Sequence, residues 1–488
     1  MVNIDLAITV AGSLLLLSLL ASKLSDRYGV PALLLFLFVG MLAGVDGIGG
    51  IIFHNAVLTN DVGTVALAFI LFAGGFGTSF KEVKPILFRG VVLSSFGVFA
   101  TAIFTAIFAK MVLGMSLAEA FVLGAIISST DAPAVFSILR SRNLGLTGQL
   151  KPILEFESGS NDPTAVFLTI SALQLLTDAS VSWGSLGVNF VLQMILGGIL
   201  GALIGFLAGK LINILKLDYE GLYPVYGVAV VLLCYGITHS IGGNGFLASY
   251  VAGIVMGNGK YVYKAALGKF TDSISWLMQI VMFIMLGLLV NPRELLPVIY
   301  IGIGTALFII FIARPIAVFL SLLGSKISPR EQIFIAWTGL KGAVPIILGT
   351  YPLLNGYDKG QFIFNLIFFV VIVSVLLQGK TLAPVARLLK VDKISQPVPD
   401  YPLEFTKKRE NQDDSTREIV IKSGSEIIGY KVKELGLPSN ILILLIYRED
   451  NFITPDGKTE IKENDRLLLY GDDDKLDESE KILLKTGK

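Results

Sequence analysis

The sequence reads Ser128-Ser129-Thr130-Asp131-Ala132-Pro133 in one long apolar run and Glu157-Ser158-Gly159-Ser160-Asn161-Asp162-Pro163 in the next. If these runs cross a bilayer, the carboxylates of Asp131, Glu157 and Asp162 lie at membrane depth. A charged side chain at the centre of a bilayer costs at least ~2.5 kcal/mol. We expect a chain that keeps three such groups together to use them.

The composition is that of a membrane protein. Of the 488 residues, 53% are hydrophobic and only 16% are charged, whereas a soluble domain has about 25% charged residues. The net charge of +1 provides no basic face for a nucleic-acid partner. A single cysteine excludes an intramolecular disulfide framework, and the two histidines argue against a zinc site.

About thirteen apolar runs are long enough to cross the lipid bilayer. They lie at 5–22, 31–45, 61–77, 88–112, 116–139, 157–177, 186–214, 222–240, 244–258, 272–290, 296–323, 331–352 and 361–388. Loops rich in Lys and Arg alternate with loops that have few, and the rich loops stay cytoplasmic. We therefore expect a multi-pass protein of a prokaryotic plasma or inner membrane, with the N-terminus outside and the C-terminus in the cytoplasm.

The apolar runs contain an internal repeat. The segment Gly40-Met41-Leu42-Ala43-Gly44 ends the second run, and Gly253-Ile254-Val255-Met256-Gly257 ends the ninth. The two runs are seven spans apart, and an odd number of spans reverses the direction across the membrane. The sequence therefore predicts inverted repeats, which are characteristic of secondary transporters.

The repeat places Thr130-Asp131-Ala132-Pro133 opposite Gly339-Leu340-Lys341-Gly342-Ala343-Val344-Pro345. Pro and Gly interrupt helices, and two interrupted spans at equivalent positions indicate a transport site. We expect two broken, crossing helices whose ends are neutralised by Asp131 and Lys341, because helix termini carry partial charges. The alternative is that both segments are ordinary proline kinks.

Asp162 is the first candidate for the transported ions. A partly dehydrated cavity favours the neutral form of a carboxylate, so this group can hold either a proton or a hard monovalent cation. Asn161 adds a neutral amide oxygen beside it. Competition for one carboxylate is sufficient for exchange, and one proton per cation would make the exchange electroneutral.

The remaining polar groups need partners. We predict an ion pair between Glu157 and Arg314, because an intramembrane charge needs a partner; the alternative is that Arg314 extends to the membrane surface. The hydroxyls of Thr130 and Ser158, and carbonyls of the unwound backbone around Asp131, are predicted to join Asp162 as ligands, since oxygen suits K⁺ or Na⁺. Alternatively, they bond the backbone or neighbouring helices.

The composition changes after about residue 390. We expect a transmembrane domain at 1–390, a linker at 391–403, a small α+β cytoplasmic regulatory domain at 404–475 and a polar tail at 476–488. Strands are predicted at 418–421, 441–447 and 461–470, and a short helix at 427–435. This part contains neither a glycine-rich phosphate loop nor a nucleophile with a base.

Together these motifs resemble the cation/proton antiporter-1 family of monovalent cation:proton antiporters. The resemblance rests on Thr130–Pro133, Phe156–Ser158 with Asn161-Asp162, Ala313-Arg314-Pro315 and Gly339–Val344. It implies a homodimer with a dimerisation bundle and a mobile core that moves as an elevator. It also implies that Asp162 is the exchanging carboxylate, with Thr130, Ser158 and Asn161 around the ion. The chain departs from the family at Lys341, where Arg is usual, and at Gly159-Ser160 and Pro163.

The C-terminal domain resembles the C-terminal (TrkA-C-like) subdomain of regulators of potassium conductance. Such a tail is similar to those of the potassium/proton branch, which places K⁺ ahead of Na⁺. The subdomain usually dimerises and binds small cytosolic ligands, including nucleotides. Apart from such a regulatory ligand, no cofactor is expected.

The sequence thus favours an electroneutral K⁺ (or Na⁺)/H⁺ antiporter that is regulated by its tail and is not an enzyme. A ligand-gated cation channel is the alternative, although no Thr-Val-Gly-Tyr-Gly filter is present. An intramembrane hydrolase with Ser158 or Ser160 as nucleophile is weaker still. It lacks a base, because neither His54 nor His239 is expected in a core-facing span.

Overall fold

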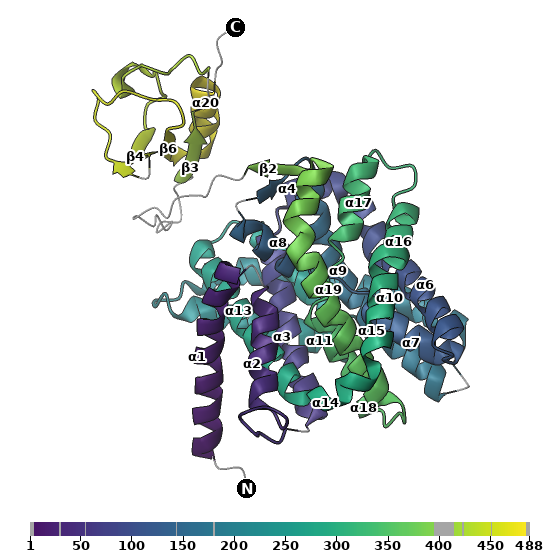
Figure 1. The fold of residues 1–488 in the computed structure, drawn as a ribbon. Helices are drawn as coiled ribbons and strands as arrows, with labels where there is room; N and C mark the ends of the chain where they lie inside the picture. Colours follow the sequence, from purple (N-terminus) through teal and green to yellow (C-terminus); the bar gives the residue numbers. More distant parts are fainter. Residues whose placement is uncertain are drawn as a thin grey trace. The chain divides into compact units, whose positions relative to one another are not determined.

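The computed structural model describes residues 4–28, 31–53, 55–142, 144–178, 181–394, 414–421, 424–449 and 451–484. The chain divides into two compact units, Met1–Gln396 and Pro397–Lys488. The first is helical, and the second is a small sheet with one helix (Figure 1). His54 and the part of the expected linker and domain between residues 395 and 413 lie outside the described residues.

The helices of the first unit follow the apolar runs expected from the sequence. In order they are α1 (Ile4–Tyr28), α2 (Ala32–Ala43), α3 (Ala56–Gly77), α4 (Phe80–Val83), η1 (Lys84–Ile86), α5 (Leu87–Val92), η2 (Leu93–Gly97), α6 (Val98–Val112), α7 (Leu117–Ile127), α8 (Ala132–Ser141), α9 (Leu150–Thr177), α10 (Trp183–Leu215), α11 (Leu222–Ser240), α12 (Gly245–Gly257), α13 (Lys264–Leu289), α14 (Pro292–Leu295), η3 (Leu296–Val298), α15 (Ile299–Phe308), η4 (Ile309–Ala313), α16 (Arg314–Ser321), α17 (Pro329–Trp337), α18 (Ala343–Leu354) and α19 (Gly360–Leu389). Among the described residues, nine apolar helical segments are long enough to cross a membrane, while α2, α12 and α18 are shorter. The prediction of a polytopic helical membrane protein is confirmed.

These helices form two groups according to their packing. We call α1–α3 and α10–α13 the bundle, and α4–α9 with α14–α19 the core. The two groups meet where α9 and α18 of the core pack against α3, α12 and α13 of the bundle. The broken helices both belong to the core.

The packing of the bundle explains the glycines of the internal repeat. α2 packs against α13, and α12 packs against α3, so each repeat lends one helix to each pair. A Cβ on Gly40 would lie 2.3 Å from the carbonyl oxygen of Ile284, and a Cβ on Gly253 would lie 2.3 Å from that of Phe72. The glycines allow backbone-to-backbone contact in both pairs.

Each repeat also contains one π-helical turn in its first long core helix. These turns are η2, between α5 and α6, and η4, between α15 and α16. Such turns are rare and are often found at functional sites. Arg314 is the residue that directly follows η4.

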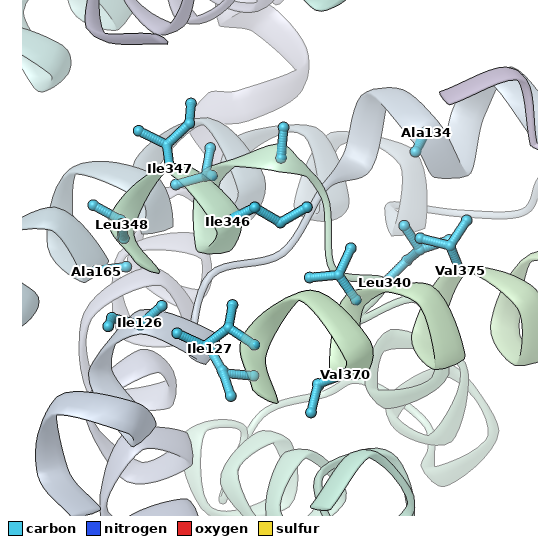
Figure 2. Close-up of a cluster of buried hydrophobic side chains, with 14 of the residues drawn as sticks. Ile126, Ile127, Ala134, Ala165, Leu340, Ile346, Ile347, Leu348, Val370 and Val375 are labelled. Atoms are coloured by element: carbon cyan, nitrogen blue, oxygen red, sulfur yellow. The ribbon is translucent and has the colours of Figure 1, made fainter. Parts of the chain in front are cut away.

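The two broken helices cross through their unwound segments. α7 ends at Ile127 and α8 begins at Ala132, while α17 ends at Trp337 and α18 begins at Ala343. The backbone N–H of Asp131 donates to the carbonyl of Leu340 over 2.8 Å, joining the two breaks. Figure 2 shows apolar side chains beside this crossing, which come from α7, α8, α9, α18 and α19, and Leu340 of the second unwound segment. Apolar side chains thus pack around part of the crossing.

Two of the short junctions between the bundle and the core precede α4 and α14, at opposite ends of the helical unit (Figure 1). At the first, Asn258 Oδ1 accepts from the backbone N–H of Phe80 (2.8 Å) and its Nδ2 donates to the carbonyl of Thr78 (2.9 Å). At the second, Asp46 Oδ2 accepts from the backbone N–H of Arg293 (3.3 Å), and Oδ1 pairs with the Arg293 guanidinium (3.2 Å). Asn258 follows α12 and Asp46 follows α2, so the two junctions are related by the repeat.

A small sheet ties the end of the core to one of its loops. Strand β1 (Leu144–Leu146) pairs antiparallel with β2 (Asp392–Ile394), with Gly145 opposite Lys393. The N–H of Thr147 also donates to the carbonyl of Val391 over 2.9 Å. The start of the expected linker at 391–403 is therefore a strand of the membrane unit.

The second unit is a four-stranded antiparallel sheet with strand order β3-β6-β4-β5. Its elements are β3 (Asp414–Val420), η5 (Val432–Glu434), β4 (Leu442–Arg448), β5 (Asn451–Ile453), β6 (Arg466–Asp472) and α20 (Asp473–Leu483). Apart from η5, the expected short helix at 427–435 consists of turns, and β5 was not expected. The prediction of a polar tail at 476–488 is wrong for its described part, because α20 extends to Leu483 and buries Leu476 and Leu483 completely.

Candidate functional site

Two charged side chains face the ends of the broken helices. Asp131 is the N-cap of α8, and its Oδ1 accepts from the N–H of Ala134 over 3.0 Å. A Cβ on Gly342 would lie 2.1 Å from Asp131 Oδ2, so the same carboxylate also lies against the start of α18. Lys341 Nζ donates to the carbonyls of Ser129 (2.9 Å) and Ser128 (3.4 Å) at the end of α7. Each charge thus faces helix ends of the opposite partial charge.

The helix α9 runs beside this crossing and carries the candidate ion ligands. It continues through Pro163, whose carbonyl accepts from Asn244 Nδ2 over 3.1 Å. A Cβ on Gly159 would lie 2.2 Å from the ring of Tyr250, so the glycine permits α12 to approach α9. Close packing at Gly159 is therefore a structural reason for a small residue at this position.

Two polar side chains of α9 bond the first break directly. Ser158 Oγ donates to the carbonyl of Thr130 over 2.9 Å and accepts from the N–H of Ala132 over 2.9 Å. Asn161 Nδ2 donates to Thr130 Oγ1 over 2.5 Å. The hydroxyl of Ser158 therefore bonds the backbone on both sides of Asp131, and the amide of Asn161 holds the Thr130 side chain in place.

Asp162 lies next to this network, and one of its carboxylate oxygens has no hydrogen-bond partner among the described residues. Its side chain is 7% exposed. The Oδ1 atoms of Asp162 and of Asn161 are both buried and have no hydrogen-bond partner within the described part of the chain. Buried polar atoms are nearly always satisfied, and uncommitted oxygens suit a hard cation or a proton. Among the described residues, these two oxygens are thus buried acceptors that the protein itself leaves unused.

An open cavity leads to Asp162. Its volume is about 790 Å³, and its inner wall includes Thr130, Asp131, Ser158 and Asp162. The cavity is also lined by Arg140, Arg142 and Lys151, which the sequence places on the Lys- and Arg-rich side, and by Lys380 and Arg387 of α19. Water and ions can therefore reach Asp162 from that side of the protein.

Glu157 and Arg314 form a buried ion pair between α9 and α16. Arg314 Nη2 contacts Glu157 Oε1, and each residue is only 1% exposed. The guanidinium therefore does not extend to the surface. A Cβ on Gly339 would lie 2.9 Å from Arg314 Nε, so the second break packs directly against this pair. Removing one partner of such a pair is costly, because the other charge stays buried.

The sequence analysis did not predict a polar cluster at the start of α7, which consists of Ser116, Glu119, Tyr357 and Lys359. Glu119 closes a capping box with Ser116 and also accepts from Lys359 Nζ over 2.7 Å and from the hydroxyl of Tyr357. Burial and the neighbouring carboxylate raise the pKa of Tyr357 to about 12. The Ser-x-x-Glu spacing of the capping box was a sequence signal for it; its partners, more than two hundred positions away, gave none.

The sequence of the membrane unit matches a known family. Residues 13–388 match the sodium/hydrogen exchanger family, in its transmembrane domain. The chain belongs to this family. Residues 416–484 match the TrkA-C domain, which extends through α20. The resemblances expected from the motifs are therefore confirmed for both units.

Related proteins agree with this assignment. The K(+)/H(+) antiporter NhaP of Alkalimonas amylolytica is 37% identical over 466 residues, which are 96% of this chain and 81% of the relative. The K(+)/H(+) antiporter NhaP2 of Shewanella baltica (strain OS223) is 38% identical over 467 residues, covering 94% and 80%. The structure of the sodium proton antiporter MjNhaP1 from Methanocaldococcus jannaschii at pH 8 superposes with a TM-score of 0.69 and 25% identity, over 79% of this chain and 99% of that one. The protein is a monovalent cation/proton antiporter, and neither an enzyme nor a channel is favoured.

Proposed function

We propose that the protein exchanges K⁺, ahead of Na⁺, for H⁺ by competition at Asp162. The free Oδ1 of this carboxylate is the observation that carries the proposal. When Asp162 is protonated it cannot compensate a cation, and when it is ionised it binds one together with Asn161 Oδ1 and Thr130. One charge enters for each charge that leaves, so the exchange is electroneutral.

The other polar residues have fixed roles in this scheme. Asp131 and Lys341 neutralise the helix ends at the crossing, and the Glu157–Arg314 pair holds α9 to α16. Ser158 lines the site, but its hydroxyl already has two backbone partners. We therefore assign Ser158 first to the broken helix and only secondarily to the ion.

The preference for K⁺ is supported by the alignments and not by the geometry of the oxygens. The relatives named K⁺/H⁺ antiporters align over 94% to 96% of the chain, which includes the TrkA-C domain. The sodium antiporter of known structure covers 79% of it. A tail of this kind is expected to respond to a small cytosolic ligand, for which a nucleotide is the first candidate.

Alternating access is proposed to occur by an elevator movement of the core against the bundle. The cavity reaches Asp162 from the Lys- and Arg-rich side, which the alternation of loops assigns to the cytoplasm. The conformation is therefore inward-facing, in a plasma or inner membrane with the N-terminus outside. The bundle would form the interface of a homodimer and stay fixed while the core moves.

The test is a pH-gradient assay in proteoliposomes with K⁺ or Na⁺ added outside. We expect K⁺ to collapse the gradient without creating a membrane potential, and Asp162→Asn to abolish the effect. Asp218→Asn, in an exposed loop, is the matched control and should exchange normally. Full exchange by Asp162→Asn would refute the mechanism, and sustained single-channel currents would indicate a channel.

A further inference from the structure

Two polar side chains of α19 hold the second broken helix and have no place in the exchange mechanism described above. Ser374 is completely buried, and Gln378 is 1% exposed. Being four residues apart, they lie on the same face of the helix. Both bond to the unwound region between α17 and α18.

Their hydrogen bonds run in a single direction. The backbone N–H of Lys341 donates to Ser374 Oγ over 3.0 Å, so Ser374 donates its own proton onward, to Gln378 Oε1 at 2.5 Å. Gln378 Nε2 then donates to the carbonyl of Trp337 over 2.8 Å, and a carbonyl can only accept. We call Ser374 and Gln378, with these three hydrogen bonds, the relay. It connects the last residue of α17 with the unwound segment before α18.

The first broken helix is held in the same way. Ser158 Oγ accepts from the N–H of Ala132 and donates to the carbonyl of Thr130. Ser158 lies on α9, the helix that follows the first broken helix, just as Ser374 lies on α19, which follows the second. Each repeat thus uses a buried serine of its last helix to satisfy the backbone of its own break.

The relay acts on the exchange site through two neighbouring residues. Lys341, whose N–H is fixed by Ser374, directs its ammonium to the carbonyls of Ser128 and Ser129. Leu340 accepts from the N–H of Asp131, directly after Thr130. A displacement of the relay would therefore move both the positive charge and the backbone of the first break.

We propose that Ser374 and Gln378 are positioning residues for the exchange reaction, which fix Lys341 and thereby the oxygens around Asp162. The inference rests on the exchange proposed at Asp162. Neither side chain contacts the transported ion. They keep the two breaks in register so that the free oxygens of Asp162 and Asn161 stay in place.

Ser374→Ala and Gln378→Met test this in the full-length protein. The control is Ser249→Ala in α12, an equally buried serine. Within the described residues its hydroxyl bonds just the carbonyl of Gly245 in its own helix, over 3.0 Å. Loss of a buried hydrogen bond should raise the apparent KM for the exchanged cation roughly fivefold in both variants. The double variant should be no worse than the worse single one, because the relay is one unit, and the control should keep the KM of the unmodified protein.

An unchanged KM in Ser374→Ala would overturn the proposal, whether or not the yield of folded protein falls. Hydrogen–deuterium exchange over residues 337–343 gives a readout that does not need transport. It should be faster in Ser374→Ala than in the Ser249→Ala control, and equal rates would also overturn the proposal. Failure of the exchange at Asp162 is detected separately, by Asp162→Asn in the same vesicles.

Discussion

Asp46 and Arg293 join the bundle to the core by both a backbone hydrogen bond and an ion pair. At the opposite end of the helical unit, the corresponding junction of the other repeat is held by Asn258 and Phe80. In each case a residue within three positions of the end of a bundle helix fixes the first turn of a core helix. An elevator movement has to bend these two junctions, so we expect them to influence the rate of exchange.

At the Asp46 junction, the backbone hydrogen bond should matter more than the charge. Arg293 is 84% exposed, and an exposed ion pair contributes only about 0–1 kcal/mol. We therefore expect Asp46→Asn, which keeps the acceptor, to exchange nearly normally, and Asp46→Ala to lower the maximal rate roughly fivefold. Rates measured in proteoliposomes decide this; equal loss in both variants would show that the charge is essential.

Asn258 should be the more sensitive of the two junctions. It makes three hydrogen bonds, with Phe80, Thr78 and Ile254, whereas no charge supports it. Asn258→Ala is expected to slow exchange roughly thirtyfold, given about 1 kcal/mol for each of the two bonds that cross the junction. The apparent KM should stay constant, because the site itself is untouched. A change confined to KM would contradict the role of this junction.

Glu157 and Arg314 should be replaceable together but not singly. Glu157→Met leaves a buried guanidinium without a partner, which typically costs about 3–5 kcal/mol. Replacing both residues by Met removes both charges and should restore much of the melting temperature. The measurement is a thermal melt of the purified protein in detergent. If the double variant melts below both single variants, the charges contribute net stability.

In the second unit, Asp465 should be essential for stability. It is completely buried and accepts two bonds of 2.7 Å from Arg448. The hydrogen bond with Asp465 raises the pKa of Arg448 above its already high ordinary value, so this stabilisation is fully present below that ordinary pKa and is lost only in strongly alkaline solution. Asp465→Ala should lower the free energy of unfolding of this unit by about 3–5 kcal/mol. The measurement is hydrogen exchange, which should become faster in β4 and β6. Varying the pH between 6 and 9 should not reproduce the effect.

Removal of residues 400–488 should leave the exchange reaction in place. The ion site and its supports lie within the first unit, so the truncated protein should still respond to K⁺ in vesicles. Its dependence on pH or on cytosolic ligands should differ from that of the full chain. Truncation that prevents folding of the membrane unit would instead assign the second unit a structural role.

The sequence predicted those features that have a local chemical signal. Gly and Pro residues indicated the breaks at Asp131 and Lys341. Single charges within apolar runs indicated that Glu157 and Arg314 form a pair. The π-helical turns gave no such signal, because one extra residue in a turn leaves the composition unchanged. Ser374 and Gln378 resemble any polar residues of an apolar helix until the break that they face is known.

The tail helix was missed for a different reason. The segment around Asp472-Asp473-Asp474 is strongly polar, and only Leu476 and Leu483, seven residues apart, mark the side that packs on the sheet. A helix with so narrow an apolar stripe is hard to distinguish from a solvated tail. The helix is buried against β3 and β6. β6 directly precedes it, but β3 lies some fifty residues earlier in the chain and reaches the helix only by pairing with β6.

The pairing of β1 with β2 determines where mechanical load on the polypeptide is felt. Backbone hydrogen bonds fasten the chain just before Ile394 to the loop between α8 and α9. A force that pulls on the chain after Ile394 would therefore act first on this loop, through the β1–β2 hydrogen bonds, and only then on the end of α19. The loop leads in one direction to the helix that Asp131 caps and in the other to the helix that carries Asp162. A pull of this kind would act on both halves of the ion site at once.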